Sequence, residues 1–89
     1  MKHYTVEKEI NGKKYTAQFA GLSVAMRSVD ETYIAGTNIN SIAKTAEFLF
    51  KYVIVEPKGL TVDDFDTADE INEVMNFAKA VMEGHLKAE

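Results

Sequence analysis

The sequence predicts an α+β domain in which an N-terminal antiparallel β-hairpin packs against about three α-helices. Two alternating runs of apolar and polar residues flank Asn11-Gly12, a pair that is typical of tight hairpin turns. Three later segments repeat their apolar residues at the spacing of a helix instead. At 89 residues the chain is too short for two cores, so we expect a single domain over residues 1–89.

The hairpin is expected over residues 1–20, with a register that follows from its two-residue turn. A type I′ turn needs positive φ at both central residues, and Asn followed by Gly meets that need. The turn pairs Ile10 with Lys13 and Tyr4 with Phe19. One face of the hairpin is then apolar: Tyr4, Val6, Ile10, Tyr15, Ala17 and Phe19. Because a lone hairpin is only marginally stable in water, the helices that follow should cover this face.

The first helix is expected over residues 23–35. Its apolar residues recur three or four positions apart, which places them on one stripe. The stripe consists of Leu22, Met26, Val29 and Tyr33. Ser23 is a suitable N-cap, and Gly36 lies beyond the end as a stop. We interpret Met26, like Met75 and Met82 further along, as a flexible side chain that fills gaps in the core.

The second helix is expected over residues 41–55, with Asn40 or Ser41 as its N-cap. Its core-facing stripe consists of Ile42, Ala46, Leu49, Phe50 and Val53. Residues 51–55 also have high strand propensity, so a short strand is the alternative for this part of the run. Pro57 ends the run, because proline has no backbone N–H and disfavours helix at the preceding residue.

Three further apolar residues of this run lie on a second stripe, roughly 100° away around the helix axis. They are Phe48, Tyr52 and Val55. Either the rest of the domain covers this stripe or a partner does. Our candidates for partner binding are these three residues, with Pro57 and Lys58 at the adjacent corner. The aromatic face of the hairpin is the alternative contact surface.

The third helix is expected over residues 68–83. Thr67 and Glu70 have the spacing of a capping box, in which each side chain bonds to the backbone of the other residue. Gly84 is suited to end the helix, because glycine readily adopts positive φ. The apolar stripe of this helix consists of Ile71, Val74, Met75, Ala78, Val81 and Met82.

Acidic residues crowd around the start of this third helix. They are Asp63, Asp64, Asp66, Asp69, Glu70 and Glu73. A calcium loop is not expected, because Ala68 stands where a third ligand belongs and the glycine of an EF-hand loop is missing. Negative charge at a helix N-terminus, together with a capped turn from Thr61 to Asp64, accounts for the cluster. We therefore predict no metal site.

Few residues are candidates for catalysis. The chain has no cysteine, which leaves no thiolate nucleophile, disulfide or Cys-based zinc site. His3 and His85 lie at opposite ends, and neither has a Ser or Asp at a spacing that indicates a catalytic triad. The glycines form no phosphate-binding motif. The sequence therefore predicts that the protein is not an enzyme, with no catalytic residues and no cofactor.

The charge pattern also argues against two classes of partner. The formal net charge is −4, and the ten Lys and Arg residues are scattered, so nucleic acid is not an expected partner. The longest apolar stretch is interrupted by Lys51 and is too short to span a membrane. The N-terminal segment MKHYTVEKEI is charged and alternating, unlike a signal peptide. We expect a cytoplasmic protein.

Three segments occur in a distinctive order along the chain: INGKKYTAQF, then FKYVIVEPKG, then DDFD leading into EINEVMNFAKAVMEG. From about Ile10 to Gly84, this order resembles the short tail assembly chaperones of siphophages and related prophages of Gram-positive bacteria. The phrase VIVEPKG, followed by an Asp-Phe-Asp segment and the last helix, contributes most to the resemblance.

The resemblance implies a non-enzymatic role in virion assembly inside the bacterial host. Members of the family associate with the long tape measure protein, keep its apolar helical segments soluble and help the tail tube protein polymerise around it. Many of their genes also produce a longer form by ribosomal frameshifting, and this chain would correspond to the short form.

Two other functions are consistent with the residues. One is a structural or regulatory adaptor that forms homo-oligomers through the second helix and has no chaperone role. The other is a small ligand-binding or metal-binding protein built around the acidic cluster. Self-association is a reasonable expectation for any of the three, because a domain of this size has a thin stability margin.

Overall fold

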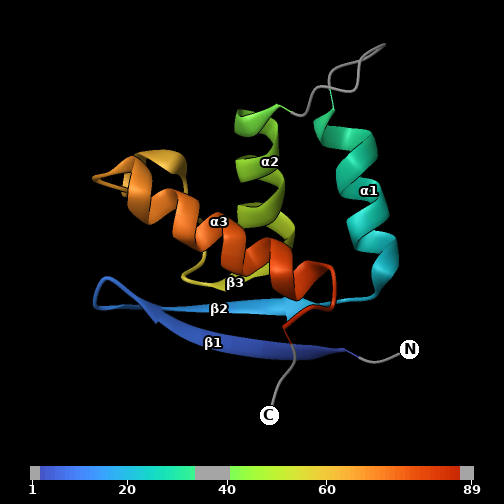
Figure 1. The fold of residues 1–89 in the computed structure, drawn as a ribbon, viewed down its shortest axis with the longest axis horizontal. Coiled ribbons are helices and arrows are strands. Elements are labelled where there is room, and N and C mark those ends of the chain that lie inside the picture. Colours follow the sequence, from blue (N-terminus) through green and yellow to red (C-terminus); the bar gives the residue numbers. More distant parts are fainter. Residues whose placement is uncertain (1–2, 34–40, 87–89) are drawn as a thin grey trace.

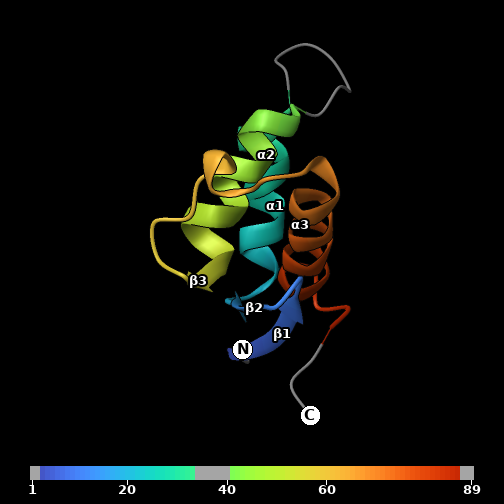
Figure 2. The same cartoon turned by 90° about the vertical axis from the view of Figure 1, so that its left-hand side faces the viewer.

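The computed structural model describes residues 3–33 and 41–86, in which three helices lie on one side of a small antiparallel sheet (Figure 1). The predicted α+β class, with an N-terminal hairpin packed against helices, is confirmed. Seen from the side, the sheet and the helices form two layers (Figure 2). Within the described ranges, no helix combines the length and the apolar character needed to cross a bilayer.

The hairpin has the predicted register. Strand β1 spans Tyr4–Ile10 and strand β2 spans Lys13–Phe19. The turn between them has φ of 53° at Asn11 and 79° at Gly12, as a type I′ turn requires. Pairing runs from Ile10 opposite Lys13 to Tyr4 opposite Phe19. The apolar face therefore points toward the helices, with Ile10, Tyr15 and Ala17 fully buried.

The segment that begins with the second helix changes conformation twice. Helix α2 spans Ile42–Phe48 with Ser41 as N-cap, a wider π-helical turn spans Leu49–Val53, and strand β3 spans Ile54–Glu56. Strand β3 pairs antiparallel with β2, so the sheet order is β1-β2-β3. The helix expected over residues 41–55 thus ends at Val53, and the strand alternative is correct for its last residues.

Helix α1 spans Leu22–Thr32 with Gly21 at the N-cap position, so the N-cap predicted at Ser23 is wrong. The predicted stop at Gly36 lies outside the described residues. The core-facing side of α1 combines apolar and polar residues. Val24 and Ala25 pack against the core, while Ser28 and Thr32 are buried and their hydroxyls donate to the backbone carbonyls of Ala25 and Ser28. A buried hydroxyl is tolerated when its hydrogen bond is made inside the helix. Hydrophobic periodicity alone therefore identifies the wrong face.

The apolar stripe of α1 is exposed. Leu22, Met26, Val29 and Tyr33 all face outward. Met26 is 70% exposed, so its interpretation as a core side chain is wrong, whereas Met75 and Met82 are buried as predicted. Ile42, assigned to the core stripe of the second helix, is also exposed. The structure therefore carries more surface apolar area around α1 than the sequence predicted.

Helix α3 spans Ala68–Met82 and packs across the hairpin. The hydroxyl of Thr67 accepts from the backbone N–H of Glu70, as predicted, but the Glu70 side chain does not complete a capping box. Its carboxylate turns to the hairpin instead. At the other end Gly84 has φ of 79°, and two backbone hydrogen bonds, Gly84 N–H to Val81 O and His85 N–H to Ala80 O, close the helix.

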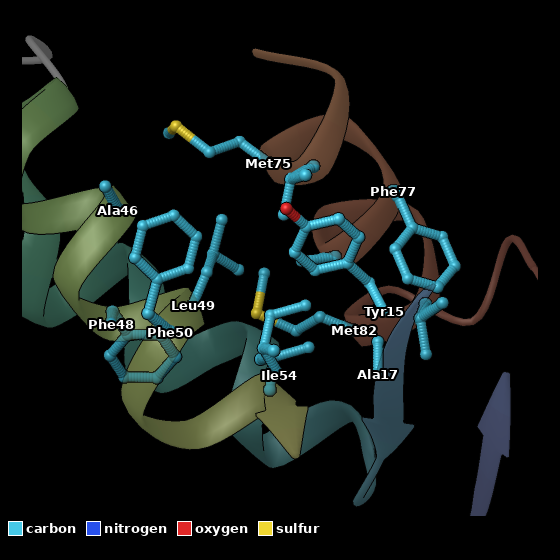
Figure 3. Packing of buried hydrophobic residues seen from close by; sticks show 14 of the residues in the cluster. Tyr15, Ala17, Ala46, Phe48, Leu49, Phe50, Ile54, Met75, Phe77 and Met82 are labelled. Carbon is cyan, nitrogen blue, oxygen red and sulfur yellow. The ribbon is translucent and has the colours of Figure 1, made fainter. Parts of the chain in front are cut away.

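The hydrophobic core lies between the sheet and the helices (Figure 3). The second helix contributes Ala46, Phe48, Leu49, Phe50 and Val53, and the third contributes Val74, Met75, Phe77, Ala78, Val81 and Met82. Four of the five residues predicted for the core stripe of the second helix are buried there. Phe48, which the sequence placed on a second stripe, belongs to the same cluster and is only 4% exposed.

Replacement of Phe48 by alanine should lower the free energy of unfolding by about 3–5 kcal/mol, because it removes a buried ring and leaves a cavity. Replacement of the exposed Met26 by alanine is the control and should change it by roughly 0.5 kcal/mol or less. Urea unfolding followed by circular dichroism measures both. Equal losses in the two variants would contradict this assignment of the core.

Candidate functional site

An apolar groove with a volume of about 670 Å³ lies beside β3, between the end of the second helix and the loop that follows the strand. Its apolar lining consists of Phe50, Ile54, Val55, Leu60 and Val62. Three charged residues also line it: Glu47, Lys51 and Lys58. The volume is within the range of roughly 300–1,000 Å³ in which ligand sites usually fall.

The wall of the groove is built by the helix-to-strand change. Alternation along β3 buries Ile54 against the core and leaves Val55 half-exposed. The chain then turns at Pro57 and at Gly59, whose φ of 71° is in the left-handed region that glycine adopts at little cost. The turn brings Leu60 into the same groove lining as Val55.

The opposite rim is held by the predicted capped turn. A short 3-10 turn spans Val62–Asp64, and the carboxylate of Asp64 accepts from the backbone N–H of Thr61 at 2.8 Å. The next residue, Phe65, stacks on Phe50 with ring centroids 5.6 Å apart. Phe65 thus packs this loop onto the core. Both rims of the groove therefore rest on packed residues.

The predicted partner-binding residues do not share one surface. Val55 and Lys58 line the groove, and Pro57 lies next to it in a hollow that Lys58 also lines. Phe48 is in the core, so its assignment as a surface contact is corrected. Tyr52 is half-buried and lies under the side chain of Arg27 from α1, whose guanidinium carbon is 4.9 Å from the ring centroid. Within the chain, α1 therefore covers much of the second stripe.

Two contacts hold the Arg27 side chain over the Tyr52 ring. Its Nε donates to Glu31 one helical turn away, at 3.1 Å, and the guanidinium also approaches the Phe48 ring. A cation over an aromatic face is attracted by the ring quadrupole. The sequence did not indicate this contact, since nothing in the spacing of Arg27 and Tyr52 shows that α1 lies against α2.

A second cluster of polar groups joins α3 to the hairpin turn. The Glu70 carboxylate is buried, and it accepts hydrogen bonds from Asn11 Nδ2 at 2.8 Å, Tyr15 OH at 3.2 Å and Lys13 Nζ at 3.3 Å. The Asn11 bond, assisted by Lys13, holds the pKa of Glu70 below its ordinary value, although burial opposes the shift. Burial and the same carboxylate raise the pKa of the Tyr15 phenol.

This cluster is a structural tie between two elements. Its three donors all come from the hairpin, and they satisfy a carboxylate that would otherwise be costly to bury. The sequence placed Glu70 in a capping box and missed the tie. A signal was present, since the register puts Lys13 on the helix-facing side of the sheet beside Tyr15, where a cation needs an acidic partner.

The acidic cluster does not gather into a site. Over residues 3–33 and 41–86, no three His, Asp or Glu side chains come together in a way that could hold a metal ion. The Glu70 carboxylate accepts hydrogen bonds from the hairpin, and the Asp64 carboxylate accepts one from the backbone N–H of Thr61. Within this cluster, Asp64 thus acts in capping and Glu70 in the structural tie.

Comparisons with protein-family models, curated proteins and solved structures found no match to this chain. The groove is therefore interpreted from its own residues. It offers apolar contact area, flanked by two ammonium groups and one carboxylate.

Replacement of Glu70 by glutamine should make the free energy of unfolding less dependent on pH in the acidic range. Because the pKa of Glu70 is lower in the folded state, the carboxylate stabilises the fold fully above its unfolded pKa of 4.5. That contribution is lost as the pH falls below 4.5 and through the lower folded pKa. Urea unfolding of both proteins, from neutral pH down to about pH 3, measures the difference.

Glu73→Gln, at an exposed position of the same helix, is the matched control and should retain the acid dependence of the wild type. An unchanged acid dependence in the Glu70→Gln variant would show that the tie does not stabilise the fold.

Proposed function

We propose that this protein is a non-enzymatic tail assembly chaperone of a phage or prophage. In this role it binds the tape measure protein in the cytoplasm of the bacterial host, keeps it soluble and assists assembly of the tail tube. The observation that carries the proposal is the origin of the groove. The segment FKYVIVEPKG, which contributes to the resemblance to this family, supplies Phe50, Lys51, Ile54, Val55, Lys58 and Gly59 to the groove lining.

Another segment of the resemblance, DDFD, supports the same surface. In DDFD, Asp64 caps the turn at the rim and Phe65 packs the loop onto Phe50. FKYVIVEPKG therefore supplies lining residues, and DDFD holds the loop that contributes the rest of the lining. Val55 and Val62 do not belong to the core cluster. Their apolar side chains are therefore available for contact with a partner.

The physical requirements of the proposed role agree with this surface. A long protein with apolar helical segments aggregates unless those segments are covered. A groove lined by apolar side chains removes part of that area from water, at roughly 25 cal/mol per Å² of apolar surface buried. Covering apolar segments reversibly needs contact area and requires no reacting group.

Val62→Asp should abolish the ability of the protein to keep co-expressed tape measure fragments soluble. Val62 lines the groove and is 44% exposed, so a carboxylate there places charge in the contact area without disturbing the core. The soluble fraction of each fragment, measured after co-expression, reports the effect. The matched control is Met26→Asp, which introduces the same charge at an exposed apolar position on α1.

Two outcomes would count against the proposal. Fragments that precipitate equally with and without the wild-type protein would remove the chaperone role. Loss of solubility with Met26→Asp but not with Val62→Asp would move the contact surface from the groove to α1.

The alternative function, a homo-oligomeric adaptor, is favoured by a different observation. The stripe on α1 formed by Leu22, Met26, Val29 and Tyr33 is apolar and exposed. The sequence placed self-association on the second helix, but Arg27 covers Tyr52 there and the core contains Phe48. The α1 stripe is therefore the surface on which an adaptor of this kind would pair.

For the adaptor function, size-exclusion chromatography with light scattering should show an oligomer that Met26→Asp converts to a monomer. The introduced carboxylates would lie against apolar side chains of the other copy, which opposes pairing. Val62→Asp should leave the oligomer intact. A wild-type protein that is monomeric at the highest soluble concentration would exclude this function.

A further inference from the structure

We propose that the groove selects apolar segments that carry acidic side chains, and that Lys51 and Lys58 make this selection. The inference rests on the proposed use of the groove as the partner-binding surface, and it names the chemistry of the segment that fits there.

The two lysines reach the groove from different elements. Lys51 belongs to the π-helical turn, and Lys58 belongs to the corner after β3. Both are exposed, and across residues 3–33 and 41–86 neither forms an ion pair with a carboxylate. The ammonium group of Lys51 lies 5.2 Å from the centroid of the Tyr52 ring, an attraction that is too weak to neutralise it.

The charge of the groove is opposite to that of the protein. Lys51 and Lys58 share the lining with a single carboxylate, Glu47, whereas the chain as a whole has a formal net charge of −4. The nearby carboxylate of Asp64 is already held by the backbone N–H of Thr61. An incoming acidic side chain thus finds two cations whose charge nothing in the groove fully compensates.

Apolar contact and charge have separate roles in such a groove. Burial of apolar surface supplies most of the binding free energy, whereas charges at an exposed rim mainly decide which partner is accepted. Segments with Lys or Arg at the same positions are repelled, which is a simple form of discrimination. Because both lysines are exposed, salt should weaken the preference.

Selection from a random peptide library displayed on phage tests the inference without assuming a partner sequence. Peptides enriched on the wild-type protein should combine a short apolar run with Asp or Glu. Peptides enriched on Lys51→Glu/Lys58→Glu should lose that acidic bias and gain Lys or Arg. Lys8→Glu/Lys44→Glu is the control, since it changes the net charge equally at two exposed positions outside the groove.

The most enriched acidic peptide then gives the size of the effect by fluorescence anisotropy. Exchange of its acidic residues for lysine should weaken binding to the wild type by roughly three- to tenfold at low salt. The same exchange should strengthen binding to Lys51→Glu/Lys58→Glu. The neutral variant Lys51→Gln/Lys58→Gln should lose the preference for the acidic peptide, and it serves if the reversed variant is unstable.

An enriched set without acidic bias, or one whose bias survives in both groove variants, would overturn the inference. So would a selection that enriches no peptide at all. These results would leave the chaperone proposal standing if tape measure fragments remain soluble with the wild type and precipitate with Val62→Asp. Fragments that precipitate in every case, while acidic peptides still bind the groove, would remove the chaperone role and keep the selectivity.

Discussion

The pairing of β3 with β2 is the constraint on which the rest of the structure depends. It requires the chain to pass from helix to strand within the run from Leu49 to Glu56, and a π-helical turn accommodates the change. The pairing directs Ile54 into the core and leaves Val55 at the surface. Because β3 and the loop after Pro57 both line the groove beside the end of the second helix, the position of the groove depends on this pairing.

The tie through Glu70 has a comparable role at the other end of the sheet. It joins the first turn of α3 to the hairpin tip through Asn11, Lys13 and Tyr15, and Tyr15 in turn lies against Phe65 with ring centroids 6.3 Å apart. The hairpin tip, α3 and the groove loop are thus connected by contacts. The groove and its proposed charge selection depend on this frame, although no residue of the tie lines the groove itself.

The sequence predicts part of the candidate site from a single segment. The apolar run that ends in a corner predicts Val55, Pro57 and Lys58, and all three lie in or next to the groove. Phe48 was misplaced because helical periodicity locates a side chain around its own axis and does not show what packs there. No sequence pattern predicts Leu60 and Val62 as lining residues, since they follow the corner in a segment without periodicity.

Local rules acting within a few residues determined much of this protein from sequence alone. They include the hairpin register at Asn11-Gly12, the caps at Thr61 and Thr67, and the end of α3 at Gly84. Only the tertiary structure decided which face of α1 is buried, where the second helix becomes a strand and what the Glu70 carboxylate contacts. Those outcomes depend on contacts between elements that are distant in sequence. Their packing, backbone pairing and electrostatic interactions form only when the chain folds.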